Sequence, residues 1–242
     1  MDPIKFKLAI DNYCPTNQFD GIGTLAEKTL HGVVKNYYSD KENQEVRVGS
    51  FYVDIKTENE IIEVQTRQFN KLIPKLKNLL DQFPVRIVYP NFHHKTIYWV
   101  DPLTGEQTPG RTSPRRGSIY DVFYELYRIK FLLNHPNLKL SILLIDIDEI
   151  RRLDGWSYDR KRGSHCIDRI PLNLVEEINI DQLTDYIKLI PFDNNFQFTS
   201  RDYAKKTKLT LRKSQIALNV LSSIGVIEKV GKVGRLNLYQ VC

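Results

Sequence analysis

The stretch FYVDIKTENEIIEVQ, residues 51 to 65, has the pattern of a β-hairpin with acids on one face. Two runs of alternating apolar and polar residues flank a polar turn at Glu58 and Asn59. If these two residues form the turn, residues whose numbers add to 117 pair across the hairpin. Asp54 then lies directly opposite Glu63.

This pairing suggests a cation site. Residues opposite each other in an antiparallel pair have Cβ atoms about 5 Å apart, and two like charges there repel. A divalent cation held by oxygen ligands turns that repulsion into binding. Gln65 is expected on the same face. The alternative is an ordinary hairpin with a solvated polar face.

The order of acids along the chain resembles the PD-(D/E)xK nuclease superfamily, whose fold is called restriction-endonuclease-like. Its pattern is an acid on a first helix, Asp on one strand, Glu-x-Lys on the next strand, then a helix and another strand. The matching features here are, in chain order, Glu27 on an expected helix over residues 22–38, Asp54, Glu63-Val64-Gln65, an amphipathic run over 69–83 and the strand 85–89. The resemblance covers residues 20–90. It implies an α/β fold with a mixed central sheet flanked by helices.

The resemblance also implies a metal site and roles for its residues. Asp54, Glu63, the Val64 carbonyl and Glu27 would bind Mg²⁺ (or Mn²⁺), and Gln65 would position the attacking water. For Glu27 the alternative is a solvent-facing helix residue. His31, four residues later on the same face, is expected to be a surface group or to support the ligands from outside.

Two positions depart from the family pattern. Val53 stands before the Asp where Pro is usual, and Gln65 stands where the family usually has Lys. The neutral amide lacks the charge with which that Lys helps to orient and activate water. Gln occurs at this place in some active members of the family, and Lys71 or Arg67 is an alternative source of the charge.

Composition points to a globular protein without a membrane span. The 242 residues are 41% hydrophobic and 26% charged, and no run of about 18 apolar residues occurs. The first residues lack the apolar core of a signal peptide. Three isolated cysteines, Cys14, Cys166 and Cys242, favour a reduced, cytoplasmic setting. The five histidines, which include His93-His94, have no zinc-ligand spacing, so no structural zinc site is expected.

The net charge of +6 is concentrated at the C-terminal end. Residues 199–242 hold nine basic and two acidic residues, a charge of +7, which leaves −1 for the rest. An excess of this kind suggests a polyanionic partner.

The C-terminal region resembles a winged-helix module. Helices are expected over 180–190, from Thr199 with a capping box, and over 210–224, followed by a hairpin over 226–239. The chain is therefore divided into a nuclease-like domain, residues 1–178, and a winged-helix domain, residues 179–242. The alternative use of this module is protein contact or domain packing. The residues expected to contact DNA lie on the third helix and the hairpin: Arg212, Lys213, Gln215, Asn219, Lys232 and Arg235.

Between the two regions we expect a strand over 96–100, a helix over 118–133 and a buried strand over 138–147. The turn-rich stretch 101–117 and the segment 151–169 are both basic, and each suits nucleic-acid contact. A flexible surface loop for the first, and packing of Trp156 against the domain for the second, are equally good explanations.

Three functions follow, in order of preference. The first is a metal-dependent DNA endonuclease that hydrolyses phosphodiester bonds, with DNA held by the winged helix. The second is a DNA-binding protein whose nuclease-like domain has lost catalysis, as Gln65 suggests. The third, by analogy of domain order alone, is the endonuclease subunit of a heteromeric transposase. Pairing of two copies into a homodimer that cuts both strands stays open.

Overall fold

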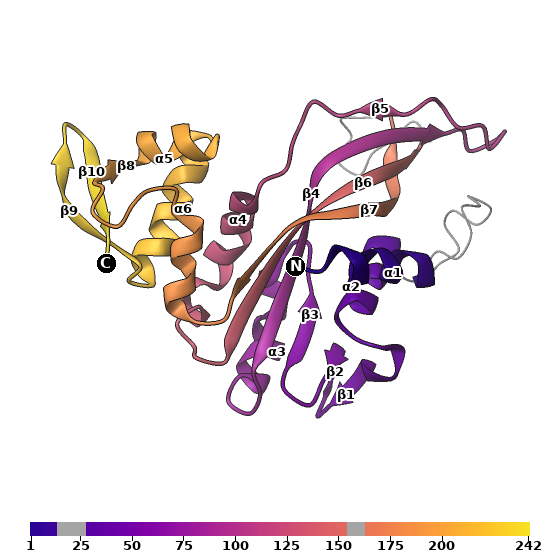
Figure 1. The fold of residues 1–242 in the computed structure, drawn as a ribbon, viewed down its shortest axis with the longest axis horizontal. Helices are drawn as coiled ribbons and strands as arrows, with labels where there is room; N and C mark the ends of the chain where they lie inside the picture. Colours follow the sequence, from indigo (N-terminus) through magenta and orange to yellow (C-terminus); the bar gives the residue numbers. More distant parts are fainter. Residues whose placement is uncertain (14–27, 154–162) are drawn as a thin grey trace.

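A mixed β-sheet forms the centre of the molecule in the computed structural model, which describes residues 1–13, 28–153 and 163–242 (Figure 1). Its strand order is β1-β2-β3-β4-β6-β7, with β5 paired to β4. The strands are β1 Gln44–Val48, β2 Phe51–Lys56, β3 Ile61–Val64, β4 Val85–Val100, β5 Arg111–Thr112, β6 Leu138–Arg152 and β7 His165–Ile180.

The sheet is antiparallel at its edges and parallel at its centre. β1, β2 and β3 pair antiparallel, β3, β4 and β6 pair parallel, and β6 pairs antiparallel with β7. Every residue of β3 is buried, as expected for a strand that helices cover on both faces. The fold is therefore of the α/β class with a mixed central sheet, as the sequence predicted.

Helices cover both faces of this sheet. On one face, α1 and α2 pack against Ile55, Ile62 and Val64. On the other face, α3 and α4 pack with Ile61 and Ile87 into a larger core. The helical segments are α1 Pro3–Tyr13, α2 Thr29–Tyr38, η1 Lys41–Asn43, η2 Phe69–Leu72, α3 Ile73–Leu79, η3 Ile119–Val122, α4 Phe123–Leu126 and η4 Tyr127–Leu132. Among the helices of the described residues, none combines the length and hydrophobicity needed to cross a membrane.

Several expected elements differ in extent. Pro74 lies in the first turn of α3, where its missing N–H costs no hydrogen bond, so the predicted helix 69–83 is divided into η2 and α3. The expected strands 85–89 and 96–100 are parts of one strand, β4. Residues 3–13, upstream of the expected elements, form α1, which packs on α2.

The C-terminal part contains two helices and a hairpin around a small sheet of order β8-β10-β9. Thr199 caps α5 with the predicted capping box to Asp202, Thr210 caps α6, and Gly225 ends it at a positive φ of 75°. The elements are η5 Leu183–Leu189, β8 Phe198–Thr199, α5 Ser200–Thr207, α6 Leu211–Ser223, β9 Ile227–Val233 and β10 Leu236–Val241. The buried face of α6 shares one continuous core with α4 and η4.

Arg86 joins the ends of three strands and the turn after β2. Its side chain, 10% exposed, donates to both oxygens of Glu60 at 2.8 and 3.2 Å, to Asp181 at 2.6 Å and to the Ser141 hydroxyl at 3.1 Å. A buried guanidinium is stable only when its donors are satisfied in this way.

We expect Arg86→Ala to lower the free energy of unfolding by about 3 kcal/mol, because Glu60 would lose its bidentate partner in a largely buried place. Denaturant unfolding measures this. Arg201→Ala, at an exposed helix position, is the control and should change stability by less than about 0.5 kcal/mol. Equal effects of the two substitutions would contradict the role given to Arg86.

Candidate functional site

The β2–β3 hairpin has the predicted register up to the position just before Asp54 and Glu63. The observed pairs between β2 and β3 are Ile55 with Ile62 and Lys56 with Ile61, and both sets of residue numbers add to 117. The next pair in this register is Asp54 with Glu63. The turn is closed by the Thr57 N–H, which donates to the Glu60 carbonyl at 3.0 Å.

The ladder between β2 and β3 ends before the two acids. Beyond Ile55 and Ile62, the Val64 N–H donates to the Asp54 carboxylate at 2.7 Å instead of to a backbone carbonyl of β2. The N–H and C=O of one strand residue point toward the same neighbouring strand. The Val64 carbonyl therefore points to the same side as its N–H, toward the opening that Asp54 spans.

Lys75, in the first turn of α3, contacts Glu63. Its Nζ lies 2.8 Å from each carboxylate oxygen of Glu63 and 2.7 Å from the Tyr52 carbonyl. Lys71, which the sequence favoured together with Arg67, has an exposed side chain one turn earlier. The sequence signal for Lys75 was its place just after Pro74, where the helix begins beside the end of β3.

The two acids have opposite electrostatic surroundings. Burial, and then the charge of Asp54, raise the pKa of Glu63 to about 7, although the ammonium of Lys75 opposes them. Burial also acts to raise the pKa of Asp54. The hydrogen bond and charge of His31, the Val64 N–H and the charge of Lys75 together outweigh it, so this pKa lies below its ordinary value. The pair thus has an anion at Asp54 and a readily protonated carboxyl at Glu63.

Two further predicted groups lie close by. The His31 Nε2 on α2 is 3.5 Å from an oxygen of Asp54, so this residue supports the acid from outside, as expected. The Gln65 side chain donates to the Arg67 carbonyl at 2.5 Å, and its backbone N–H donates to the Val88 carbonyl at 2.8 Å. Its amide is bound to its own loop. Glu27 lies outside the described residues.

The predicted DNA-contacting residues fall into two groups. Arg212, Gln215, Lys232 and Arg235 are exposed. Lys213 instead forms an ion pair with Asp121 at 2.7 Å, and exposed Asn219 accepts a hydrogen bond from Lys130 at 3.0 Å. These two contacts join α6 to the part of the chain that carries the sheet. Trp156 and residues 160–162 of the second basic segment are outside the described residues.

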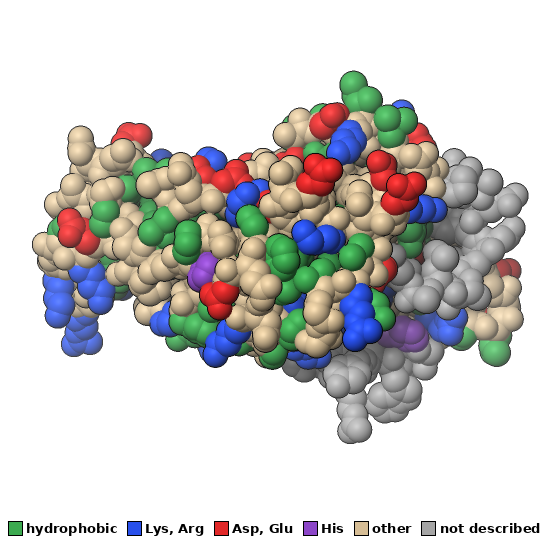
Figure 2. All heavy atoms as spheres, turned by 90° about the horizontal axis from the view of Figure 1, so that it is seen from below, with side chains coloured by type: hydrophobic (Ala, Val, Ile, Leu, Met, Phe, Trp, Pro, Cys, Tyr) green, Lys and Arg blue, Asp and Glu red, His purple; other side chains and the backbone are tan. Residues whose placement is uncertain are grey.

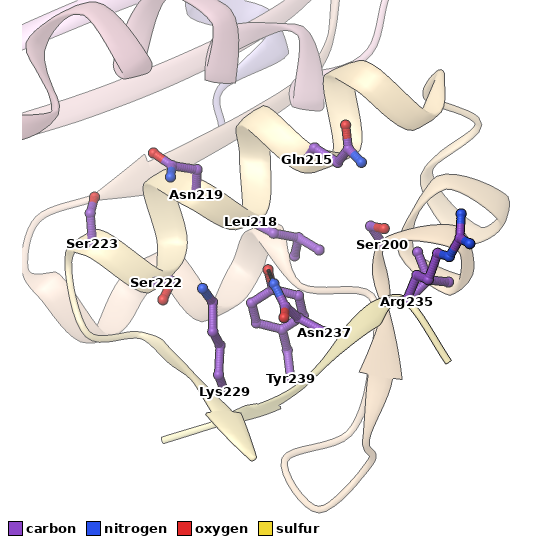
Figure 3. A pocket seen from close by; sticks show the side chains of 11 residues that line it. Ser200, Gln215, Leu218, Asn219, Ser222, Ser223, Lys229, Arg235, Asn237 and Tyr239 are labelled. Carbon is purple, nitrogen blue, oxygen red and sulfur yellow. Dashed lines mark hydrogen bonds between the residues drawn. The ribbon is translucent and has the colours of Figure 1, made fainter. Parts of the chain in front are cut away.

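A polar groove of about 400 Å³ lies between α6 and the β9–β10 hairpin. Figure 3 shows Lys229 and Asn237 rising from the hairpin toward Asn219 and Ser222 on the helix. Lys and Arg side chains also group at the end of the molecule where the hairpin lies (Figure 2). Amide, hydroxyl and cationic groups together suit phosphates and base edges.

Residues 28–181 match the family described as "Domain of unknown function (DUF8091)". The chain belongs to this family. The matched region contains the whole seven-stranded sheet and both acids of the hairpin. No solved structure matches the chain.

A relative in Treponema pallidum (strain Nichols), described as "Uncharacterized protein", is 33% identical over 150 residues. The aligned part is 61% of this chain and 59% of the relative, so the match spans a little over half of that protein.

The raised pKa of Glu63 predicts a pH dependence of stability. The folded metal-free protein keeps a proton up to about pH 7 that the unfolded chain releases near 4.5, so the free energy of unfolding should fall as pH rises between these values. The slope is at most about 1.4 kcal/mol per pH unit.

Denaturant unfolding at several pH values measures this slope with a chelator present. Glu63→Gln should remove it, whereas Glu58→Gln, in the exposed turn of the same hairpin, should keep it. A slope that survives in Glu63→Gln would place its origin elsewhere.

Proposed function

We propose that the protein is a metal-dependent DNA endonuclease. The observation that carries the proposal is the meeting of Asp54, Glu63 and the Val64 backbone at the opened end of the β2–β3 ladder, with the Lys75 ammonium on Glu63. Carboxylate and carbonyl oxygens are the ligands that Mg²⁺ and Mn²⁺ prefer. Burial, and then the charge of Asp54, raise the pKa of Glu63, and a dication would relieve the repulsion between the two acids.

The order of elements supports the same proposal. A helix, three antiparallel strands, a second helix and a strand parallel to the third follow one another as α2, β1, β2, β3, α3 and β4. This is the order that the resemblance to the PD-(D/E)xK superfamily implies. We likewise propose that residues 179–242 are a winged-helix domain, an assignment that the helix–helix–hairpin order and the family match ending at residue 181 support.

Each residue of the proposed site has a separate role. Asp54, Glu63 and the Val64 carbonyl would hold Mg²⁺, with Glu27 as a further ligand. When bound, the ion would polarise the scissile phosphate and make a water molecule more acidic. Lys75 holds the Glu63 carboxylate and supplies the positive charge that Gln65 lacks. His31 keeps Asp54 ionised, and the exposed basic residues of the C-terminal part would bind the phosphate backbone.

Asp54→Asn should abolish Mg²⁺-dependent nicking of supercoiled plasmid while DNA affinity changes little, since the variant removes a metal ligand and no phosphate contact. Lys75→Met should lower the rate by about 10- to 100-fold, as expected for a group that orients a ligand. Lys71→Met, one turn earlier and exposed, is the matched control.

The second hypothesis, DNA binding without catalysis, has a specific observation behind it, because the Gln65 amide is bound to its own loop. If the wild-type protein binds DNA but leaves plasmid, branched and single-stranded DNA intact with Mg²⁺ or Mn²⁺, this hypothesis replaces the first. Cleavage retained by Asp54→Asn would defeat the proposed site.

For DNA binding we expect Arg212→Ala, Lys232→Ala and Arg235→Ala together to reduce the salt dependence of affinity. Each lost phosphate contact lowers the slope of log K against log[salt] by about 1. Lys213→Ala is the control on the same helix, because Asp121 already neutralises this residue. An equal loss in the control and in Arg212→Ala alone would contradict the assignment.

A further inference from the structure

A second cluster of metal-binding side chains lies halfway along β4. The Nδ1 of His93 is 3.1 Å and the Nδ1 of His94 is 3.4 Å from one oxygen of Asp146 on β6. One donor atom from each of the three residues lies within 4.8 Å of the others. All three side chains are partly exposed, at 29%, 36% and 26%, so an ion from solvent has access to them.

The backbone is irregular at this place in a way that builds the cluster. Consecutive residues of a regular strand point to opposite faces, so His93 and His94 could not both reach one carboxylate. The register between β4 and β6 shifts between Phe92 and Lys95, which brackets the two histidines. The register between β6 and β7 shifts on both sides of Asp146. Such bulges redirect side chains and are frequent beside functional sites.

The two distances to Asp146 are compatible with a tetrahedral transition-metal site. Bonds of 2.0–2.2 Å from Zn²⁺ to imidazole nitrogen and carboxylate oxygen place neighbouring ligand atoms roughly 3.3–3.6 Å apart. The separations of 3.1 and 3.4 Å are close to that range. Two imidazoles and one carboxylate are a donor set that favours Zn²⁺ over Mg²⁺.

A second layer of hydrogen bonds holds the carboxylate in place. The Asn173 side chain on β7 donates to one oxygen of Asp146 at 3.0 Å, and the His94 N–H donates to the other at 2.9 Å. Partners of this kind orient ligands and strengthen metal binding.

We propose that His93, His94 and Asp146 form a Zn²⁺ site distinct from the Asp54–Glu63 centre. His93 lies five residues beyond Val88, the partner of Val64 in the parallel ladder, which is about 16 Å along the strand. Three protein ligands leave a fourth position for water or another ligand. The bound ion would fix the irregular part of β4 between Phe92 and Lys95 against β6. This site does not depend on the proposed nuclease function.

The test is calorimetric titration of the full-length, tag-free, metal-stripped protein with ZnCl₂ and, separately, with MgCl₂. We expect one equivalent of Zn²⁺ to bind at this cluster. Any heat from Mg²⁺ should be the same in the wild type and in His93→Gln/His94→Gln, because Mg²⁺ would bind at the Asp54–Glu63 centre instead. His93→Gln/His94→Gln should lose that equivalent, and His94→Gln alone should weaken it at least tenfold. In the wild type, Zn²⁺ should also raise the thermal unfolding midpoint.

Two controls separate the outcomes. His135→Gln removes a histidine that pairs with one carboxylate, Asp81, and should keep full Zn²⁺ binding. Asp54→Asn should keep it as well. Loss of the equivalent in Asp54→Asn, or its retention in the double variant, would overturn the proposal, as would wild-type protein that binds no Zn²⁺. If the double variant does not fold by circular dichroism, the single variant His94→Gln decides.

Discussion

The end of hydrogen bonding between β2 and β3 is the constraint on which the candidate centre depends. Two acids placed opposite each other in a complete ladder would repel across about 5 Å with no group to separate them. Here the ladder stops at Ile55 and Ile62, and the Asp54 carboxylate takes the Val64 N–H that a backbone carbonyl would otherwise accept. The backbone stays satisfied while the strands separate, and the acids gain an opening into which the Val64 carbonyl also points.

The register of this hairpin could be predicted from the sequence because its causes are local. Alternation fixes which residues face each other, and the length of the turn fixes their offset. The same is true of the caps at Thr199 and Thr210, where a side chain and a backbone N–H three residues later decide the helix start.

Two other features could not be predicted, because distant parts of the chain determine them. Pro90 argues against a central strand, yet β4 continues through it. The Val88 carbonyl faces β3, where it accepts the Gln65 N–H. The ring nitrogen of Pro90, two residues later, faces the same side. It lies just past the last hydrogen bond between β3 and β4, so no N–H donor is required there. The cluster of His93, His94 and Asp146 could not be predicted either. It depends on a bulge in β4 and on a residue of β6, so its ligands have no characteristic spacing within one segment of the sequence.

The position of Lys75 bears on how a centre with Gln65 could work. In the family pattern, the ammonium belongs to a Lys at the position that Gln65 occupies here. In this protein the ammonium belongs to Lys75 on α3, which donates to the Glu63 carboxylate and to the Tyr52 carbonyl. Because both Glu63 oxygens contact Lys75, a dication that takes one of them leaves the ammonium bound to the other oxygen and to Tyr52. A carboxyl with a pKa of about 7 gives up its proton to a dication at little cost near neutral pH. Under the proposed function, the ammonium would therefore stay in the centre together with the ion.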